Sequence, residues 1–144
     1  MDELTMRIGT PFAGADRQGL ENFLQRQGLD YDESITYTVL LESDSGIAAC
    51  GSCHNNVIKC VAVDPAYRGQ NLLGTVMTQL VAHLFEEGRS HYFLFTKPQN
   101  RELFAGMGLY AVESTDKVLL MENRRDGLER YIRQLKAETP AVQG

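Results

Sequence analysis

An amphipathic helix between two apolar strands is the feature that most constrains the fold of this chain. Residues 65–88 begin with a proline and end with a glycine, and their apolar residues recur at helical spacing. These apolar positions are Leu72, Leu73, Val76, Met77, Leu80, Val81 and Leu84. The flanking segments 57–63 and 91–96 are apolar runs typical of buried strands. A strand–helix–strand crossover joins parallel strands, so the sequence predicts an α/β fold.

Further strands are expected on both sides of this crossover. Runs of β-branched, aromatic and other apolar residues, separated by turn residues, predict strands at 4–10, 35–43, 45–53, 108–114 and 117–123. Several of these runs follow one another through short turns, which is typical of antiparallel hairpins. The sequence therefore predicts a mixed, mostly antiparallel sheet flanked by helices.

Three more helices are expected. One lies in 14–29 and ends at Gly28, and a short one follows Pro98. The third covers 125–138, where Asp126 and Glu129 are spaced as a capping box. Its apolar face comprises Leu128, Tyr131, Ile132 and Leu135. We expect one domain over residues 1–138, followed by a frayed tail or linker at 139–144.

Charge and hydropathy exclude several classes of protein. The net charge is −5 and the isoelectric point about 5.2, which argues against nucleic acid as the main partner. No apolar run approaches the roughly 20 residues that a membrane span requires. The first ten residues lack the basic start and apolar core of a signal peptide. We therefore expect a cytoplasmic protein with reduced thiols and no membrane partner.

The stretch CGSCH at 50–54 matches the attachment pattern of a c-type haem, and with Cys60 it could also suit zinc. Haem attachment requires export, which the amino terminus does not support. A hairpin turn centred on Asn55 would place Cys50 opposite Cys60, with Cys53 on the other face. Buried thiols are therefore the favoured interpretation, with zinc as the alternative, and we expect neither metal nor haem. Nothing near Cys60 in the sequence would clearly lower its pKa, so we expect it in the core.

The junction VAVDPAYRGQNLLG at 61–74 is the candidate site. A strand ends there, Pro65 breaks it, and the turn at Arg68 and Gly69 opens the long helix. The first amides of a helix are unpaired and its dipole is positive there, so this turn can hold a phosphate or diphosphate. Gly74 would let backbone or ligand approach closely. The alternative is an ordinary strand-to-helix turn with a surface arginine.

The pattern V-A-V-D-P-x-Y-R-G-Q, followed by FLFTK and NRELFAGMGLYAV, resembles the GCN5-related N-acetyltransferase (GNAT) superfamily over roughly residues 4–123. The resemblance implies the acyl-CoA N-acyltransferase fold, in which the fourth and fifth strands, here 57–63 and 91–96, splay apart. It also implies acetyl-CoA as cosubstrate and direct acetyl transfer to an amine. The cofactor-binding residues carried over are Val61, Ala62, Val63, Arg68, Gly69, Gln70, Asn71, Leu72, Leu73, Gly74 and Thr75.

A closer resemblance is to the amino-terminal module of the bacterial citrate lyase ligases, and it rests on IAACGS, FLFTKP, LFAGMGLYAVE and VLLMEN…GLERYIRQL. This resemblance implies citrate lyase or its acyl carrier subunit as a partner. In that family a nucleotidyltransferase domain with a His-x-x-His-type ATP site follows. The three histidines here, at 54, 83 and 91, cannot form that motif, so the ATP-dependent step is not expected in this chain. The alternative function is a non-catalytic module that binds a CoA-like group or the carrier.

Three departures from the superfamily pattern affect the expected chemistry. Asn71 and Leu73 replace small residues of the turn, and Leu73 could crowd a diphosphate. Phe104 occupies the position where many members place the tyrosine that protonates the departing thiolate, and a phenyl ring has no proton to donate. The catalytic residues therefore stay unknown. Candidate general bases are Glu42, Glu113 and His54, and the sequence does not choose among them.

Overall fold

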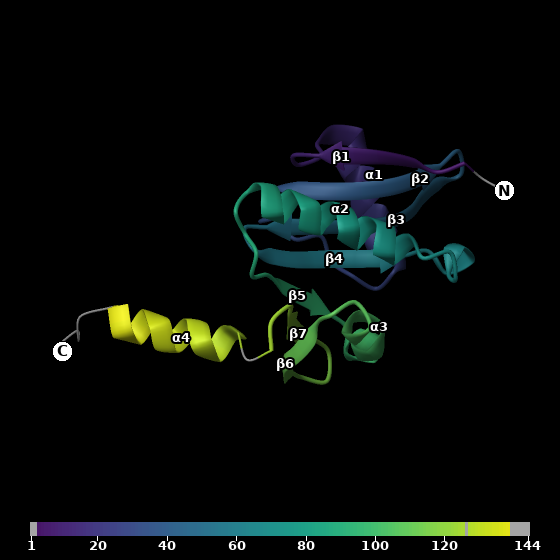
Figure 1. Cartoon of the computed structure of the whole chain (residues 1–144). Helices are drawn as coiled ribbons and strands as arrows, with labels where there is room; N and C mark the ends of the chain where they lie inside the picture. Colours follow the sequence, from purple (N-terminus) through teal and green to yellow (C-terminus); the bar gives the residue numbers. More distant parts are fainter. Residues whose placement is uncertain (1–2, 126, 139–144) are drawn as a thin grey trace.

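The computed structural model of the protein describes residues 3–125 and 127–138. Seven strands form one sheet in the order β1-β2-β3-β4-β5-β7-β6 (Figure 1). The strands are β1 (Thr5–Gly9), β2 (Tyr37–Ser43), β3 (Gly46–His54), β4 (Val57–Val63), β5 (Phe93–Thr96), β6 (Tyr110–Ser114) and β7 (Leu119–Glu122). The helices are α1 (Gly14–Arg26), α2 (Leu72–Glu86), α3 (Arg101–Ala105) and α4 (Gly127–Glu138). Only β4 and β5 pair in parallel among the strand pairs of the described residues, which confirms the predicted mixed sheet.

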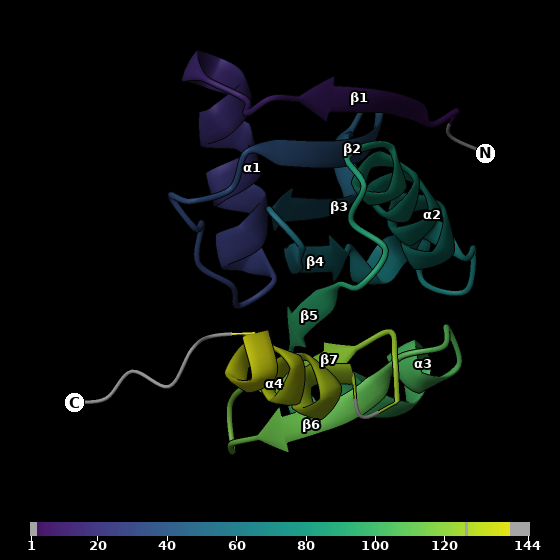
Figure 2. The same cartoon turned by 60° about the vertical axis from the view of Figure 1, so that its left-hand side comes forward.

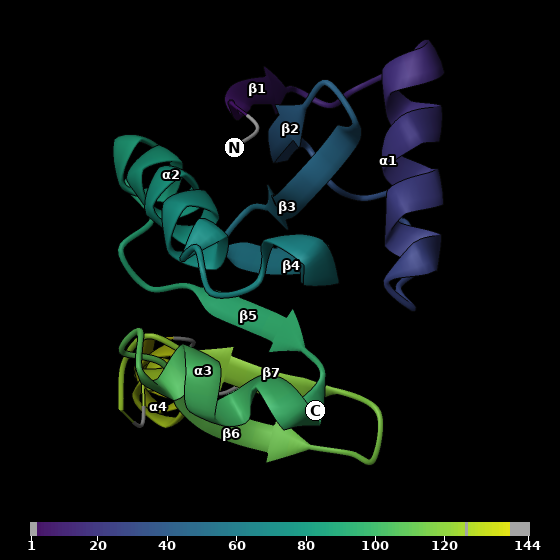
Figure 3. The same cartoon turned by 90° about the vertical axis from the view of Figure 1, so that its right-hand side faces the viewer.

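The sheet separates two apolar cores, because α1 and α2 lie on its opposite faces (Figures 2 and 3). The core under α1 includes Leu20, Phe23, Leu24, Leu40 and Cys50. The larger core, under α2, includes Val39, Ile58, Val76, Leu80, Leu84 and Phe104. The helical stripe predicted for α2 therefore faces the sheet. Each fully buried Leu or Phe stabilises the fold by roughly 1.5–3 kcal/mol.

The hairpin β3–β4 differs from the predicted register. Its turn is centred between Asn55 and Asn56, so that His54 pairs with Val57. A bulge then adds one residue to β4 opposite Gly51, and Cys60 adopts a φ of 56° there. Cys50 consequently pairs with Ala62, and the prediction that it lies opposite Cys60 was wrong. A regular hairpin cannot anticipate a bulge, which shifts all later pairs.

The cysteines nevertheless divide between the faces as predicted. Cys50 lies in the core under α1 with Cys60 packed against it, and Cys53 lies in the core under α2. Within residues 3–125 and 127–138, no group of three or more His, Cys, Asp or Glu residues is arranged to hold a metal ion. None of the helices in this part of the chain is both long and apolar enough to span a membrane.

Helix α4 projects away from the end of the sheet (Figure 1). Ile132 and Leu135, from its predicted apolar face, are 42% and 44% exposed. Asp126 of the predicted capping box lies outside the described residues, as do the side chains of Leu128 and Tyr131. The predicted tail at 139–144 also lies outside them, so the domain boundary at residue 138 stays a prediction.

Candidate functional site

A cleft of about 700 Å³ opens where β4 and β5 diverge. The two strands pair at only two positions, Val57 with Phe93 and Ile58 with Leu94. Beyond these pairs β5 turns away from β4 towards β7 (Figure 3). The cleft is lined both by Gln27 and Leu29, which follow α1, and by the first residues of α2. It therefore reaches elements on both faces of the sheet.

Most of the residues predicted for the site lie in this cleft. Eight of them line it, namely Val61, Ala62, Val63, Arg68, Gly69, Asn71, Leu72 and Leu73. The other three, Gln70, Gly74 and Thr75, do not line it. The fold also adds residues that the sequence reasoning missed, and these are Gln27, Leu29, Cys60, Tyr67, Phe95, Thr96, Lys97, Gln99, Asn100, Leu103 and Met107. Apart from Cys60 and Tyr67, which adjoin the predicted residues, they come from segments distant in the sequence, and the resemblance pointed only to the strand at 91–96, which contains Phe95 and Thr96.

The turn between β4 and α2 is fixed by its own side chains. The Asp64 carboxylate accepts a hydrogen bond of 2.8 Å from the amide of Ala66, and this caps a single 3₁₀ turn at Pro65–Tyr67. The chain then passes through Gly69 with a φ of 86° and Asn71 with a φ of 56°. Gly69 suits its position because a left-handed conformation disfavours side chains. These backbone angles place the start of α2 at the mouth of the cleft.

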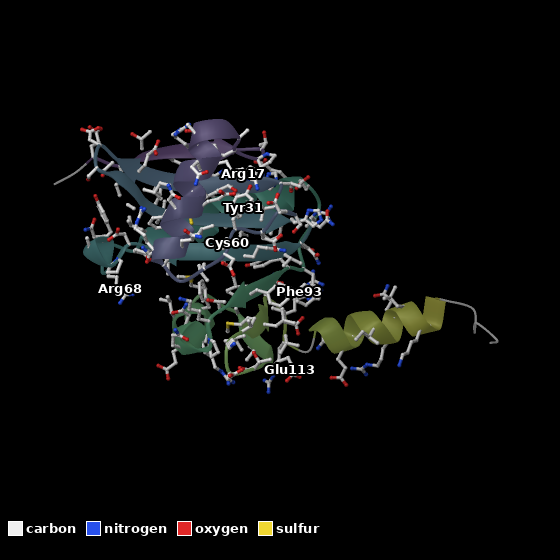
Figure 4. All side chains as sticks on the ribbon, turned by 180° about the vertical axis from the view of Figure 1, so that it is seen from behind. Arg17, Tyr31, Cys60, Arg68, Phe93 and Glu113 are labelled. Carbon is white, nitrogen blue, oxygen red and sulfur yellow. The ribbon has the colours of Figure 1, made fainter. Side chains whose placement is uncertain are left out.

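The start of α2 carries no side-chain cap among the described residues. Asparagine is a common N-cap, but in the left-handed conformation Asn71 directs its amide elsewhere. A Cβ on Gly74 would lie 2.5 Å from Oδ1 of Asn71, so the Asn71 side chain rests against this glycine. The first amides of α2 therefore stay available to an anion. Arg68 is exposed on the turn that leads into this helix (Figure 4).

Leu73 lines the cleft, and it also packs as a half-buried residue against the core under α2. The sequence predicted that its bulk could crowd a diphosphate at this turn. Part of that bulk is turned into the core.

The opposite wall contains a buried phenyl ring and a cation. Phe104 is 1% exposed and lines the cleft, so the aromatic position predicted from the sequence lies at the site without a hydroxyl group. Lys97 follows β5, and its Nζ donates a hydrogen bond of 2.8 Å to the carbonyl of Gln27 beyond the end of α1. This contact connects the segment after β5 to the end of α1 across one end of the cleft.

None of the three candidate bases lines the cleft. Glu42 accepts a hydrogen bond of 3.1 Å from Arg7 at the β1–β2 pair. Glu113 is exposed on β6, and His54 lies at the β3–β4 turn. The sequence offered these residues as candidates without a reason to choose among them, and the general base stays unassigned.

The loop between α1 and β2 is tied to the sheet beside the cleft. Lys59 on β4 donates a hydrogen bond of 2.8 Å to Asp32, and this bond, with two from Ser34, lowers the pKa of Asp32 to about 2. Arg17 on α1 stacks over Tyr31, with 4.4 Å between its Cζ and the ring centroid. Cys60 donates a weak hydrogen bond to the carbonyl of Asp30, and burial raises the pKa of its thiol. Figure 4 shows Arg17, Tyr31 and Cys60 from the side that α1 covers.

This chain is similar to known proteins in both its sequence and its fold. The chain is 38% identical to the "[Citrate [pro-3S]-lyase] ligase" of Klebsiella pneumoniae over 120 residues, which is 83% of this chain and 35% of that protein. It is 33% identical to the Escherichia coli K12 protein of the same name over 118 residues, 81% of this chain and 34% of that one. The chain thus spans about a third of the length of these relatives. An acyl-CoA N-acyltransferase structure from Pseudomonas aeruginosa superposes with a TM-score of 0.70 at 14% identity, covering 85% of this chain and 100% of that one. With residues 6–109 matching the family model for acetyltransferases, the chain belongs to the acetyltransferase (GNAT) family.

Proposed function

We propose that the cleft between β4 and β5 binds acetyl-CoA, and that the domain transfers the acetyl group to an amine or to a carrier-bound thiol. The observation that carries this proposal is the position of the uncapped start of α2, beside Arg68, at the mouth of the cleft. The diphosphate would lie on the amides of residues 69–74, and the pantetheine arm would run along Val61–Val63. No metal takes part in this proposal.

The similarity to citrate lyase ligases suggests the setting. Those relatives are named for a reaction on citrate lyase, and their matching portion is about a third of their length. We therefore propose citrate lyase or its acyl carrier subunit as the partner of this domain. The reaction would take place in the cytoplasm, where the three free cysteines stay reduced.

Phe104 favours a second candidate function. It is buried at the position where a transferase of this family commonly has a proton donor. A cleft that binds acetyl-CoA or a CoA-like prosthetic group without transferring acetyl would make the domain a recognition module. Binding is common to both functions, and turnover separates them.

The test of binding is the thermal stability of the domain with acetyl-CoA. A ligand that binds only the folded state stabilises it by about 2.7 kcal/mol at a hundredfold excess over its dissociation constant. We expect acetyl-CoA to raise the melting temperature of the wild type, and Arg68→Glu to abolish the rise. Arg130→Glu makes the same charge change on exposed α4 and should leave the rise intact. A wild type that shows no rise at millimolar acetyl-CoA contradicts the proposal.

A further inference from the structure

Helix α4 carries an apolar face that the domain leaves open. Ile132 and Leu135 on this face are 42% and 44% exposed. The sequence continues the face with Leu128 and Tyr131, which lie four residues before them. Among the side chains that the structure describes, none from α4 belongs to either core. The helix projects away from the end of the sheet, where another molecule can reach it (Figure 1).

A helix of this length depends on packing for its stability. α4 has 12 residues, and an isolated helix so short is marginal in water. In proteins, most helical stability comes from burial of the apolar face. A groove of about 520 Å³ lies between the first turns of α4 and the strands β6 and β7, and Ile132 and Tyr110 line it. The open apolar surface therefore continues from the helix onto β6, the last strand of the sheet.

Two opposite charges border one side of this apolar face. Glu129 lies three residues before Ile132, and Lys136 lies four residues after it, so both are next to it on the same side of the helix. Both are exposed, and Glu129 forms an ion pair of only 3.9 Å with Arg133. The two charges are about two helical turns apart. This side of the helix is therefore complementary in charge to a copy of itself that runs in the opposite direction.

We propose that α4 pairs antiparallel with α4 of a second copy of this chain. Ile132 packs against the partner's Leu135, and the two-fold axis repeats this contact. Glu129 then lies beside the partner's Lys136, and the axis repeats the ion pair as well. In a parallel pair, the sides that carry these charges would lie on opposite edges of the interface, and they would not meet. The charges therefore select the antiparallel arrangement.

The interface is small, which sets the strength of the association. Each α4 is about 18 Å long, and stable complexes bury roughly 1,200–2,000 Å². We therefore expect a weak dimer that depends on protein concentration. No described residue of α4 lines the cleft between β4 and β5, so the pairing does not rest on the proposed binding of acetyl-CoA.

The experiment is sedimentation velocity of the 144-residue chain at concentrations from about 5 to about 500 µM. We expect the dimer fraction of the wild type to rise over this range and Leu135→Glu to stay monomeric. Glu129→Lys and Lys136→Glu each bring like charges together at two places, so each should weaken the dimer by about tenfold. The double variant restores opposite charges and should regain most of the wild-type affinity.

The matched control is Arg130→Glu, which makes the same change of charge as Lys136→Glu but on the opposite side of the helix. It should dimerise like the wild type. Because α4 contributes to neither core, thermal unfolding followed by circular dichroism should show an intact domain in every variant. This measurement separates a lost interface from a lost fold.

Three results would overturn the inference. A wild type that stays monomeric over the whole range would leave the apolar face of α4 to a different partner. A dimer that persists in Leu135→Glu would have its interface elsewhere on the molecule. If the double variant associates no better than the single variants, the two helices do not pair antiparallel.

Discussion

The absence of a side chain at Gly51 sets how closely helix α2 approaches the sheet. Gly51 on β3 faces α2, and a Cβ built on it would lie 2.6 Å from Val76 and 2.8 Å from Leu80. Both neighbours are fully buried in the core under α2. Gly51 also lies opposite the bulge in β4, whose next residues line the cleft. The same residue therefore affects the packing of the helix and the wall of the site.

We predict that Gly51→Ala destabilises the fold by about 1–3 kcal/mol, because the added methyl must displace packed side chains. Urea unfolding followed by circular dichroism measures the loss. The matched control is Gly19→Ala on α1, where a Cβ would meet no atom within 4 Å. That variant should gain up to about 1 kcal/mol from its higher helix propensity. Equal effects of the two substitutions would contradict this account of Gly51.

At the scale of elements, an ion pair connects the loop between α1 and β2 to the sheet. Asp32 in this loop and Lys59 on β4 form an ion pair of 2.8 Å, in which the Asp32 side chain is 38% exposed. Such a half-open pair contributes about 1 kcal/mol or less after screening by solvent. The folded-state pKa of Asp32, about 2, lies below its ordinary value of about 3.9. Its contribution is therefore complete above about pH 5 and is lost as the pH falls towards 2.

The corresponding prediction concerns Asp32→Asn. We expect this variant to unfold at a lower urea concentration than the wild type by a constant margin between pH 6 and pH 8. The margin should shrink below about pH 4, as the carboxyl of the wild type becomes protonated. Asp116→Asn, in the exposed turn between β6 and β7, serves as the control and should show no such trend. A margin that persists unchanged at pH 2.5 would show that the ion pair is not its cause.

At the scale of the whole molecule, the sheet places one buried thiol in each core. Cys50 is fully buried under α1, and burial raises its pKa. Cys53 is 1% exposed under α2, and burial raises its pKa to about 11. Cys60 is half-buried and lines the cleft. Thiolates are the reactive form, so exposure and pKa together order the three cysteines.

We predict that iodoacetamide labels Cys60 first in the native protein, and that acetyl-CoA slows this reaction. Cys50 and Cys53 should react together and much later. Each becomes accessible only when its core opens, and both cores pack against the same sheet. Mass spectrometry of peptides over time measures the three rates. If Cys50 reacts well before Cys53, the layer of α1 opens independently of the layer of α2.

Local patterns in the sequence predicted the elements better than their contacts. The stripe from Leu72 to Leu84 is periodic enough to place α2 and its buried face without other information. The hairpin register was wrong because the turn is centred between Asn55 and Asn56 instead of on Asn55, and because a bulge at Cys60 adds a further residue to β4. Eight of the eleven predicted site residues line the cleft, since they adjoin one turn. Gln27 and Lys97 were missed because their contact joins residues 70 positions apart.

The short pairing between β4 and β5, at only two positions, also affects how the molecule can bend. It divides the sheet into a plate of β1–β4 and a plate of β5, β7 and β6, which meet along a short hinge line. Beyond this line, the Lys97 side chain spans the opening and donates a hydrogen bond to the carbonyl of Gln27. A ligand lodged in the opening would touch both plates and act as a wedge that resists their relative bending. A bound ligand would thus reduce the relative motion of the two plates. It would also reduce the motion of α4, which follows β7 of the second plate.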